Sequence, residues 1–420
     1  MTERLLQYIW QFKYYHSNHF ISTDGDPIQV IHPGLLNTGQ GPDFASAKIK
    51  VGNTIWVGSV ELHIKSADWQ LHKHSLDPNY KNVILHVVWQ HDQELLLPFP
   101  TIVLEDKVPI WRLKKYDEWM AAKQFIPCGN SIATIPALIV NSWKERLLAE
   151  RLQEKAMGII ERLQSNHFHW EEVCWWLLAN NFGMKVNAEA FEKIASTIPL
   201  SVLTKHKVSI HQLEALLLGQ AGFLEENFTE DYPLLLQREY RFLKKKYALP
   251  DIHIPVFFLR MRPANFPTIR LAQLAMFVHT SLHLFSKIIT ATDLAAIRSL
   301  LQVTANDFWH YHYRMEEATE FHPKKLGDDM IDTICVNTIV PLLFTYGLYQ
   351  NKQSYKEKAI AWLQHIKVEK NNIIAGFLDI GIPVQSAFDS QALLQMKKQY
   401  CNKKRCLECS VGNYLLKKQV

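Results

Sequence analysis

The chain has 420 residues, of which 48% are hydrophobic and 21% are charged. This composition excludes a disordered or fibrous protein, and the length allows two or three domains with a large core. The net charge of +5 permits contact with an acidic polymer such as nucleic acid but does not require one. The sequence has no uninterrupted apolar run of about eighteen residues and no N-terminal secretion signal, so we expect no membrane segment and a cytoplasmic location.

The N-terminal part is predicted to be mixed α/β. Residues 2–15 have the spacing of an amphipathic helix, with Thr2 as its cap. Alternating or apolar runs predict strands at 28–32, 45–51, 54–65, 82–90 and 101–104. Gly52 and Asn53 suit a tight turn, so the strands on either side are expected to pair antiparallel.

The length of this turn decides where Asp43 lies. A two-residue loop pairs small and apolar residues across the hairpin, with Ala45, Ala47 and Ile49 opposite Val60, Gly58 and Trp56. It sets Asp43 opposite Leu62, whereas a three-residue loop sets Asp43 opposite Glu61. We favour the two-residue loop, with Gly41-Pro42 turning the Asp43 carboxylate toward Glu61.

One face of the strand 54–65 carries chemistry. Glu61, His63 and Lys65 alternate with the apolar Val60 and Leu62, so an acid, an imidazole and an amine share one face. Two acids at the end of a hairpin are enough to hold Mg²⁺, and such a cation can stabilise a scissile phosphate and activate water. The alternative is that this face is the solvated side of an edge strand.

These residues resemble a known superfamily. Pro42-Asp43, followed after seventeen residues by Glu61-Leu62-His63, resembles the PD-(D/E)XK nucleases, with histidine where the superfamily usually has lysine. The resemblance implies that Asp43 and Glu61 bind Mg²⁺ or Mn²⁺, and that His63 or Lys65 orients the attacking water. It also implies a restriction-endonuclease-like domain and a metal-dependent phosphodiesterase acting on nucleic acid. A scaffold that binds nucleic acid or protein, with a degenerate nuclease site, is the nonenzymatic alternative.

Over its whole length the chain also resembles an uncharacterised bacterial family of unknown function. The shared features are the motifs GPDF, VELH and RPANFP, the DW..H.H run and the cysteine-containing tail. This second resemblance implies no activity.

Histidines near the same strand offer a different metal centre. The four candidates are His63, His72, His74 and His86. Three imidazoles could converge on zinc, with Asp68 or Asp77 as a fourth or outer ligand, which would make a transition-metal hydrolase. The alternative is that these histidines are ordinary hydrogen-bonding residues.

Beyond residue 140 the spacing of apolar residues becomes helical. Helices are predicted at 141–164 and 170–181, from Ser209, from Asp231, and at 268–289. The predicted fold class is therefore α+β: a mixed α/β domain followed by a mostly α-helical one. The predicted domains are an α/β nuclease-like domain at 1–125, a helical domain at 126–400, and a cysteine-containing tail at 401–420 packed on the helical domain.

Three arginines surround a proline-rich loop, RMRPANFPTIR, namely Arg260, Arg262 and Arg270. Guanidinium groups near a helix start suit a substrate phosphate. The alternative is a rigid interdomain corner whose arginines pair with acids.

The tail contains Cys401, Cys406 and Cys409. Clustered thiols in a cytoplasmic protein favour a metal over disulfides. Cys128, Cys335 or a histidine would have to complete a zinc or iron–sulfur site. Reduced structural or redox thiols are the alternative.

Overall fold

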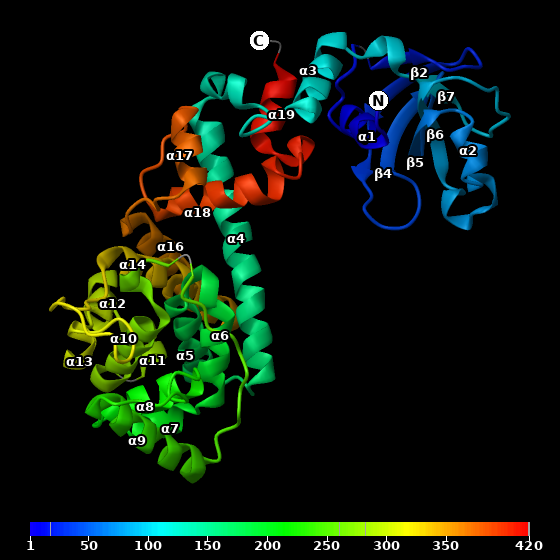
Figure 1. Ribbon diagram of the computed structural model, residues 1–420. Helices are drawn as coiled ribbons and strands as arrows, with labels where there is room; N and C mark the ends of the chain where they lie inside the picture. Colours follow the sequence, from blue (N-terminus) through cyan, green and yellow to red (C-terminus); the bar gives the residue numbers. More distant parts are fainter. Residues whose placement is uncertain (17, 260, 282, 419–420) are drawn as a thin grey trace. The chain divides into compact units, whose positions relative to one another are not determined.

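A computed structural model of the chain describes residues 1–16, 18–259, 261–281 and 283–418. The chain forms two compact units (Figure 1). The sheet unit comprises Met1–Trp143, Gly376–Ile382 and Met396–Val420, and the helical unit comprises Lys144–Ala375 and Pro383–Gln395.

The C-terminal tail belongs to the sheet unit, whereas the sequence prediction placed it on the helical domain. The Tyr8 hydroxyl donates to Asn413 Oδ1 at 2.6 Å, and the Arg112 guanidinium donates to the Leu416 carbonyl at 2.8 Å. These contacts join residues about 300 to 400 positions apart in sequence, which local spacing cannot reveal.

The sheet unit is built on a seven-stranded mixed sheet of order β1-β2-β4-β5-β6-β7, with β3 paired to β4. The strands are β1 His19–Ile21, β2 Pro27–His32, β3 Leu35–Leu36, β4 Phe44–Val51, β5 Thr54–Lys65, β6 Val83–Gln90 and β7 Thr101–Val103. Neighbours from β1 to β5 are antiparallel, whereas β5, β6 and β7 run parallel. Strand β5 is therefore an inner strand.

Because β5 and β6 are parallel, the chain must cross back over the sheet between them. The crossover contains three short segments: the helix α2 Asp68–Leu71 and the 3₁₀ turns η1 His74–Leu76 and η2 Pro78–Tyr80. The crossover brings His72 and His74, two of the candidate histidines, close to His63 on β5.

The hairpin between β4 and β5 has the predicted two-residue loop. Val51 pairs with Thr54, and Gly52 adopts a left-handed backbone with φ of 55°. Ala47 lies opposite Gly58 and Ile49 lies opposite Trp56, as predicted.

The register then shifts at a β-bulge between Phe44 and Ala47, where Ser46 has a φ of 57°. The extra residue sets Phe44, and not Ala45, opposite Val60. The prediction attributed the turn of Asp43 toward Glu61 to Gly41-Pro42 and did not include this bulge. The bulge moves the whole start of β4 by one residue and carries Asp43 toward Glu61.

Helix α1 Glu3–Gln11 begins at the predicted cap, because the Thr2 hydroxyl accepts the Leu5 N–H. Leu6, Ile9 and Trp10 are fully buried, and each side chain of this size stabilises the fold by about 1.5 to 3 kcal/mol. The helix ends earlier than predicted, where Lys13 turns left-handed. The sheet unit also contains α3 Ile110–Ala121, α19 Ser410–Lys417, the start of α4 Ala137–Ser165 and part of α17 Asn372–Asp379.

The helical unit contains the remaining helices. They are α4 Ala137–Ser165, which starts in the sheet unit, α5 Trp170–Phe182, α6 Met184–Thr197, α7 Leu200–Lys205, α8 Ile210–Gln220, α9 Asp231–Tyr247, α10 Pro267–Thr280, α11 Leu284–Thr290, α12 Leu294–Leu301, α13 Asp307–His310, α14 Asp328–Ile334, α15 Val340–Tyr349, α16 Gln353–His365 and α18 Ala387–Gln395. Ser209 caps α8 as predicted. The predicted helix at 268–289 is wrong, because α10 ends at Thr280 and α11 follows a left-handed His283. The coarse prediction of a mixed α/β part followed by helices is confirmed.

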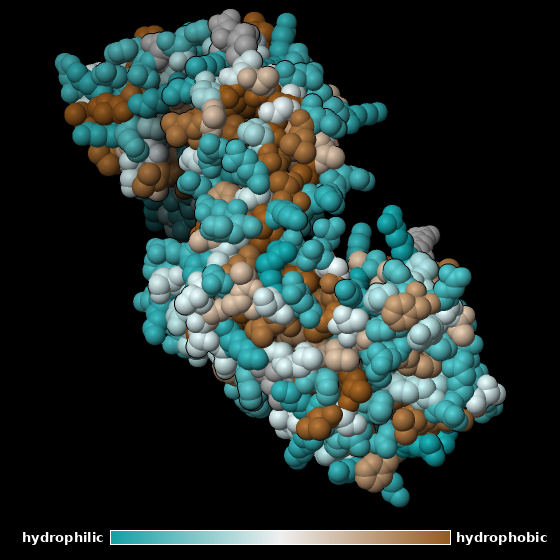
Figure 2. All heavy atoms as spheres, turned by 90° about the vertical axis from the view of Figure 1, so that its left-hand side faces the viewer, coloured by the Kyte–Doolittle hydropathy of each residue, from teal (hydrophilic) through white to brown (hydrophobic). Residues whose placement is uncertain are grey.

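Among the residues that the structure describes, one helical run, Asp328–Tyr349, is long and apolar enough to cross a membrane by length and composition. Its most apolar window is 72% buried inside the protein. On the face shown in Figure 2, hydrophilic side chains predominate and hydrophobic ones lie in groups among them.

Candidate metal centre

The face of β5 that carries Glu61 and His63 is covered. The exposed fraction of Glu61 is 5% and that of His63 is 1%. Trp69 from the crossover packs against the His63 ring, with 6.3 Å between ring centroids. The interpretation of this face as the solvated side of an edge strand is therefore wrong, because β5 is an inner strand and the crossover shields it.

The two acids of the predicted pair lie next to each other. The Asp43 N–H donates to Glu61 Oε2 at 2.9 Å, and the Leu62 N–H donates to Asp43 Oδ2 at 3.0 Å. The Gln7 amide of α1 donates to Asp43 Oδ1 at 2.8 Å. Side-chain hydrogen bonds thus replace the strand ladder where β4 begins, and they hold both carboxylates in place.

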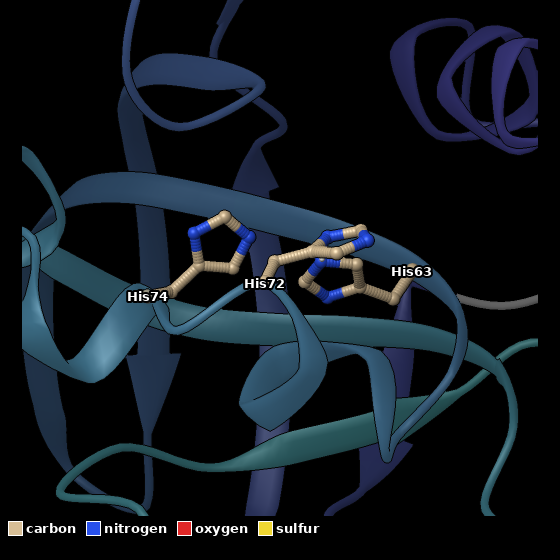
Figure 3. A group of neighbouring side chains, drawn as sticks. All are labelled: His63, His72 and His74. Carbon is tan, nitrogen blue, oxygen red and sulfur yellow. Dashed lines mark hydrogen bonds between the residues drawn. The ribbon is translucent and has the colours of Figure 1, made fainter.

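Three histidines converge (Figure 3), and Glu61 lies beside them. The donor nitrogens of His63, His72 and His74 all lie within 4.8 Å of one another, and His63 Nε2 is 3.2 Å from His72 Nδ1. Glu61 Oε1 lies 3.4 Å from His74 Nε2 and 3.7 Å from His63 Nε2. Ligands about 2.0 Å from one tetrahedral ion are about 3.3 Å apart, so these spacings suit a shared cation.

The crossover places His72 and His74 by a tight turn. Asp68 Oδ2 accepts the Lys65 N–H at the start of α2, and Lys73 adopts a left-handed backbone with φ of 58° after its end. This reversal directs both neighbouring histidines toward His63 (Figure 3). Asp77 accepts the Asn79 N–H, so in this structure the two aspartates cap turns.

His86 lies behind His63. His86 Nε2 is 2.9 Å from His63 Nδ1, and its Nδ1 is 3.4 Å from the Thr101 hydroxyl. A proton on His63 Nδ1 directed at His86 leaves His63 Nε2 with a free lone pair facing the other donors. His86 is therefore a positioning residue in this structure, although the sequence made it a candidate ligand.

Burial sets the charges of this site. It raises the pKa of Glu61 to about 8, with the Asp43 charge as the next cause, and it raises the pKa of Asp43 to about 6. Burial and then His86 lower the pKa of His63 to about 2, and burial also lowers the pKa of His74. Neutral imidazoles are the form that binds metals, and a bound cation would favour ionised carboxylates.

Among the donor atoms of Glu61 and the three histidines, His74 Nε2 is buried without a hydrogen-bond partner, and it lies 3.4 Å from Glu61 Oε1. The His74 ring stacks on Tyr80 with 3.9 Å between centroids. A buried nitrogen held in this way points to a ligand. Sequence reasoning missed Gln7, Trp69 and Tyr80, since only the folded crossover and α1 bring them to the site.

Other candidates lie elsewhere. The Lys65 side chain is 55% exposed, and its amine lies 3.6 Å from Asp92 Oδ2, so it is not directed at the acids. The remaining candidates are the three arginines of the helical unit. Arg270 is buried, with hydrogen bonds to Gln273 and Asn265, so it is unavailable to a phosphate. Arg262 is exposed, and Arg260 lies outside the described residues.

Residues 3–372 match a protein family whose description is "Protein of unknown function (DUF2851)". The chain belongs to the DUF2851 family. The DUF2851 match includes Asp43, Glu61 and the histidines and ends before the cysteines of the tail. Searches of curated proteins and of solved structures found no match. Membership of this family assigns no activity, so the function must be argued from the site.

Proposed function

We propose that the sheet unit is a metal-dependent hydrolase that cleaves phosphodiester bonds in nucleic acid. The observation that carries this proposal is the convergence of one carboxylate and three imidazoles, contributed by Glu61, His63, His72 and His74. Surface histidines seldom have a buried acid and an unpartnered ring nitrogen aimed at the same point.

The donor set selects the class of metal. Imidazole nitrogens suit zinc and related transition ions, whereas Mg²⁺ prefers oxygen ligands. We therefore propose Zn²⁺ here, with Mn²⁺ admitted by the Glu61 carboxylate, in preference to the Mg²⁺ that the nuclease resemblance implies. When bound, such an ion polarises a phosphoryl oxygen and lowers the pKa of coordinated water.

The chain supplies a proton acceptor beside the donor set. Burial brings the pKa of Asp43 to about 6, close to the neutral pH at which a general base works best. The Gln7 amide and the Leu62 N–H orient its carboxylate. We propose that Asp43 accepts the proton of the attacking water, while His86 and Thr101 hold His63 in the required tautomer.

The choice of a phosphodiester substrate is supported by the resemblance of Pro42-Asp43 and Glu61-Leu62-His63 to PD-(D/E)XK nucleases. A leading helix, the mixed sheet and the adjacent acids Asp43 and Glu61 agree with that resemblance. The net charge of +5 is compatible with a polyanionic substrate.

The test uses the full chain stripped of metal by a chelator. Zn²⁺, Mn²⁺ or Mg²⁺ is then added, and cleavage of single-stranded and duplex DNA and RNA is measured. We expect cleavage to return with Zn²⁺ or Mn²⁺, and to fall about a hundredfold or more in His74→Ala. The control is His91→Ala, since His91 is exposed and outside the donor set.

Different outcomes reject different parts of the proposal. Chelator-resistant cleavage, or a His74→Ala variant as active as the control, would reject the metal centre as the catalytic site. Tight Zn²⁺ or Mn²⁺ binding without cleavage of any of these nucleic acids would retain the centre and reject the phosphodiester substrate.

A further inference from the structure

The cysteines of the tail are buried free thiols. Cys401, Cys406 and Cys409 belong to the sheet unit together with Cys128, whereas Cys335 belongs to the helical unit. A zinc or iron–sulfur site at these cysteines stays a prediction from the sequence.

A cavity of about 590 Å³ lies within the helical unit. It is lined by the start of α12, the second half of α16 and the segment that follows α16. Its apolar lining comes from Leu294, Ala295, Ala361 and Trp362. Sites for small molecules are typically of about 300 to 1,000 Å³, with a mainly apolar lining and a few polar groups. The size and the lining of this cavity fit that description.

The charged groups that line the cavity are mostly cations. They are Arg298, Lys358 and Lys367, against the carboxylate of Asp293. Asp293 is also the cap of α12, where its Oδ1 accepts the Ala296 N–H at 2.9 Å, and the positive end of the helix offsets part of its charge. Three cations against one acid therefore favour an anion in the cavity.

Lys358 is held in place and still has a donor for a ligand. Its ammonium group donates to the carbonyl oxygens of Ile288 and Ile289, at 3.4 Å and 3.1 Å, and lies 4.9 Å from the centre of the Trp362 ring. An ammonium group has three N–H donors, so one remains for a ligand. Burial lowers the pKa of Lys358, and a carboxylate beside the amine would oppose that shift.

Arg298 is held in a similar way from the other helix. Its Nη1 pairs with Asp332 Oδ1. A guanidinium group has five N–H donors, so the ion pair leaves donors for a second partner. The cavity thus presents cations from both α12 and α16 beside an apolar lining.

We propose that this cavity binds a small organic acid, with its carboxylate at Lys358 and Arg298 and its apolar body against the apolar lining. An inorganic anion would leave the apolar lining unfilled, and an uncharged apolar ligand would leave the cations without a partner. The cavity shares no residue with the histidine centre, so this proposal does not rest on the hydrolase function.

The test is isothermal titration of the full chain with octanoate and, separately, with octanol, which has the same chain length and no charge. We expect octanoate to bind about tenfold more tightly or better, because hydrogen bonds to charged groups contribute most to affinity. Lys358→Gln should lower the affinity for octanoate about tenfold and change that for octanol less than about twofold. The matched control is Lys356→Gln, on the same helix and outside the lining, which should bind both like the wild type.

A second variant tests the location without removing a charge. Ala295 is exposed on α12 and lines the cavity, so the indole of Ala295→Trp should fill it and lower the affinity for octanoate about tenfold or more.

Four results would overturn the proposal. They are no binding of octanoate at millimolar concentration, equal affinities for octanoate and octanol, an octanoate affinity in Lys358→Gln equal to that of Lys356→Gln, and an unchanged affinity in Ala295→Trp. The wild-type titrations decide the first two even if a variant fails to fold.

Discussion

Glu61 in the sheet unit and Glu214 in the helical unit are both buried acids, and their surroundings differ. Burial raises the pKa of Glu61 to about 8 and that of Glu214 to about 7. Glu214 Oε2 accepts hydrogen bonds from the Tyr232 hydroxyl at 2.7 Å and the Trp309 indole at 3.0 Å. Glu61 instead directs Oε1 at the ring nitrogens of His63 and His74.

The difference distinguishes a structural acid from a candidate ligand. The Tyr232 hydroxyl and the Trp309 indole donate to one oxygen of Glu214, and neither of these partners is an imidazole. Neutral imidazoles have a lone pair each, so the donors around Glu61 can share one ion. Burial and a raised pKa alone would not have separated the two sites.

The largest expected effect is a loss of Zn²⁺ affinity, which should distinguish the two glutamates when each is replaced by glutamine. Glu61→Gln removes the charged ligand, and we expect the affinity for Zn²⁺ to fall about a hundredfold or more. Glu214→Gln should bind Zn²⁺ like the wild type. Isothermal titration of both variants with Zn²⁺ checks this, and equal affinities would erase the distinction between the two glutamates.

A smaller loss of Zn²⁺ affinity is expected when His86, which lies behind His63, is replaced. His86→Ala removes the hydrogen-bond partner of His63 Nδ1, and we expect Zn²⁺ affinity to fall about 10- to 100-fold. The same titration measures it. A loss as large as that of Glu61→Gln would mean that His86 is itself a ligand, and no loss would remove its positioning role.

Glu214 is expected to make the free energy of unfolding depend on pH. Its folded pKa of about 7 lies above the ordinary 4.5, so between these values the folded state holds a proton that the unfolded state has lost. The contribution of Glu214 is fully present below about pH 4.5 and is lost as pH rises through about 7, by about 3 kcal/mol in total.

Urea unfolding at several pH values tests this prediction, with the free energy of unfolding taken from the transition of the helical unit. In Glu214→Gln the side chain stays neutral, so the decline in stability between pH 4.5 and 7 should become shallower than in the wild type. An unchanged slope would show that Glu214 is ionised in the folded protein.

The smallest effect is expected for Lys65→Ala. Its amine pairs with Asp92 at the surface, and exposed pairs contribute about 0 to 1 kcal/mol. Zn²⁺ affinity and nucleic-acid cleavage should stay within about twofold of the wild type. A loss of cleavage at unchanged metal affinity would instead restore Lys65 as the group that orients water.

Local sequence predicted the hairpin because Gly52-Asn53 and the alternation from Thr54 to Lys65 are short-range signals. The same alternation placed Glu61 and His63 on one face. The bulge at Ser46 was missed, since no glycine marks the left-handed residue that shifts the register. Asp43 was therefore brought to Glu61 for a reason that the sequence did not show.

The histidine group and the position of the tail were predictable only in part. His72 and His74 lie close to His63 in sequence, so their convergence needed one crossover of the expected kind. Arg112 and Leu416, which are 304 positions apart, are joined by a hydrogen bond that depends on the tail packing in the sheet unit. Sequence spacing has no information about such a contact, whereas burial and tertiary packing decide it.

The most direct test of the metal centre is a crystal structure of the full chain grown with Zn²⁺ or Mn²⁺, with the ion located by its anomalous scattering. We predict a peak about 2.0 to 2.2 Å from Glu61 Oε1, His63 Nε2 and His74 Nε2, with His72 Nδ1 closing the set. A peak between Asp43 and Glu61 that leaves the imidazoles uncoordinated, or no peak in the sheet unit near β5, would contradict it.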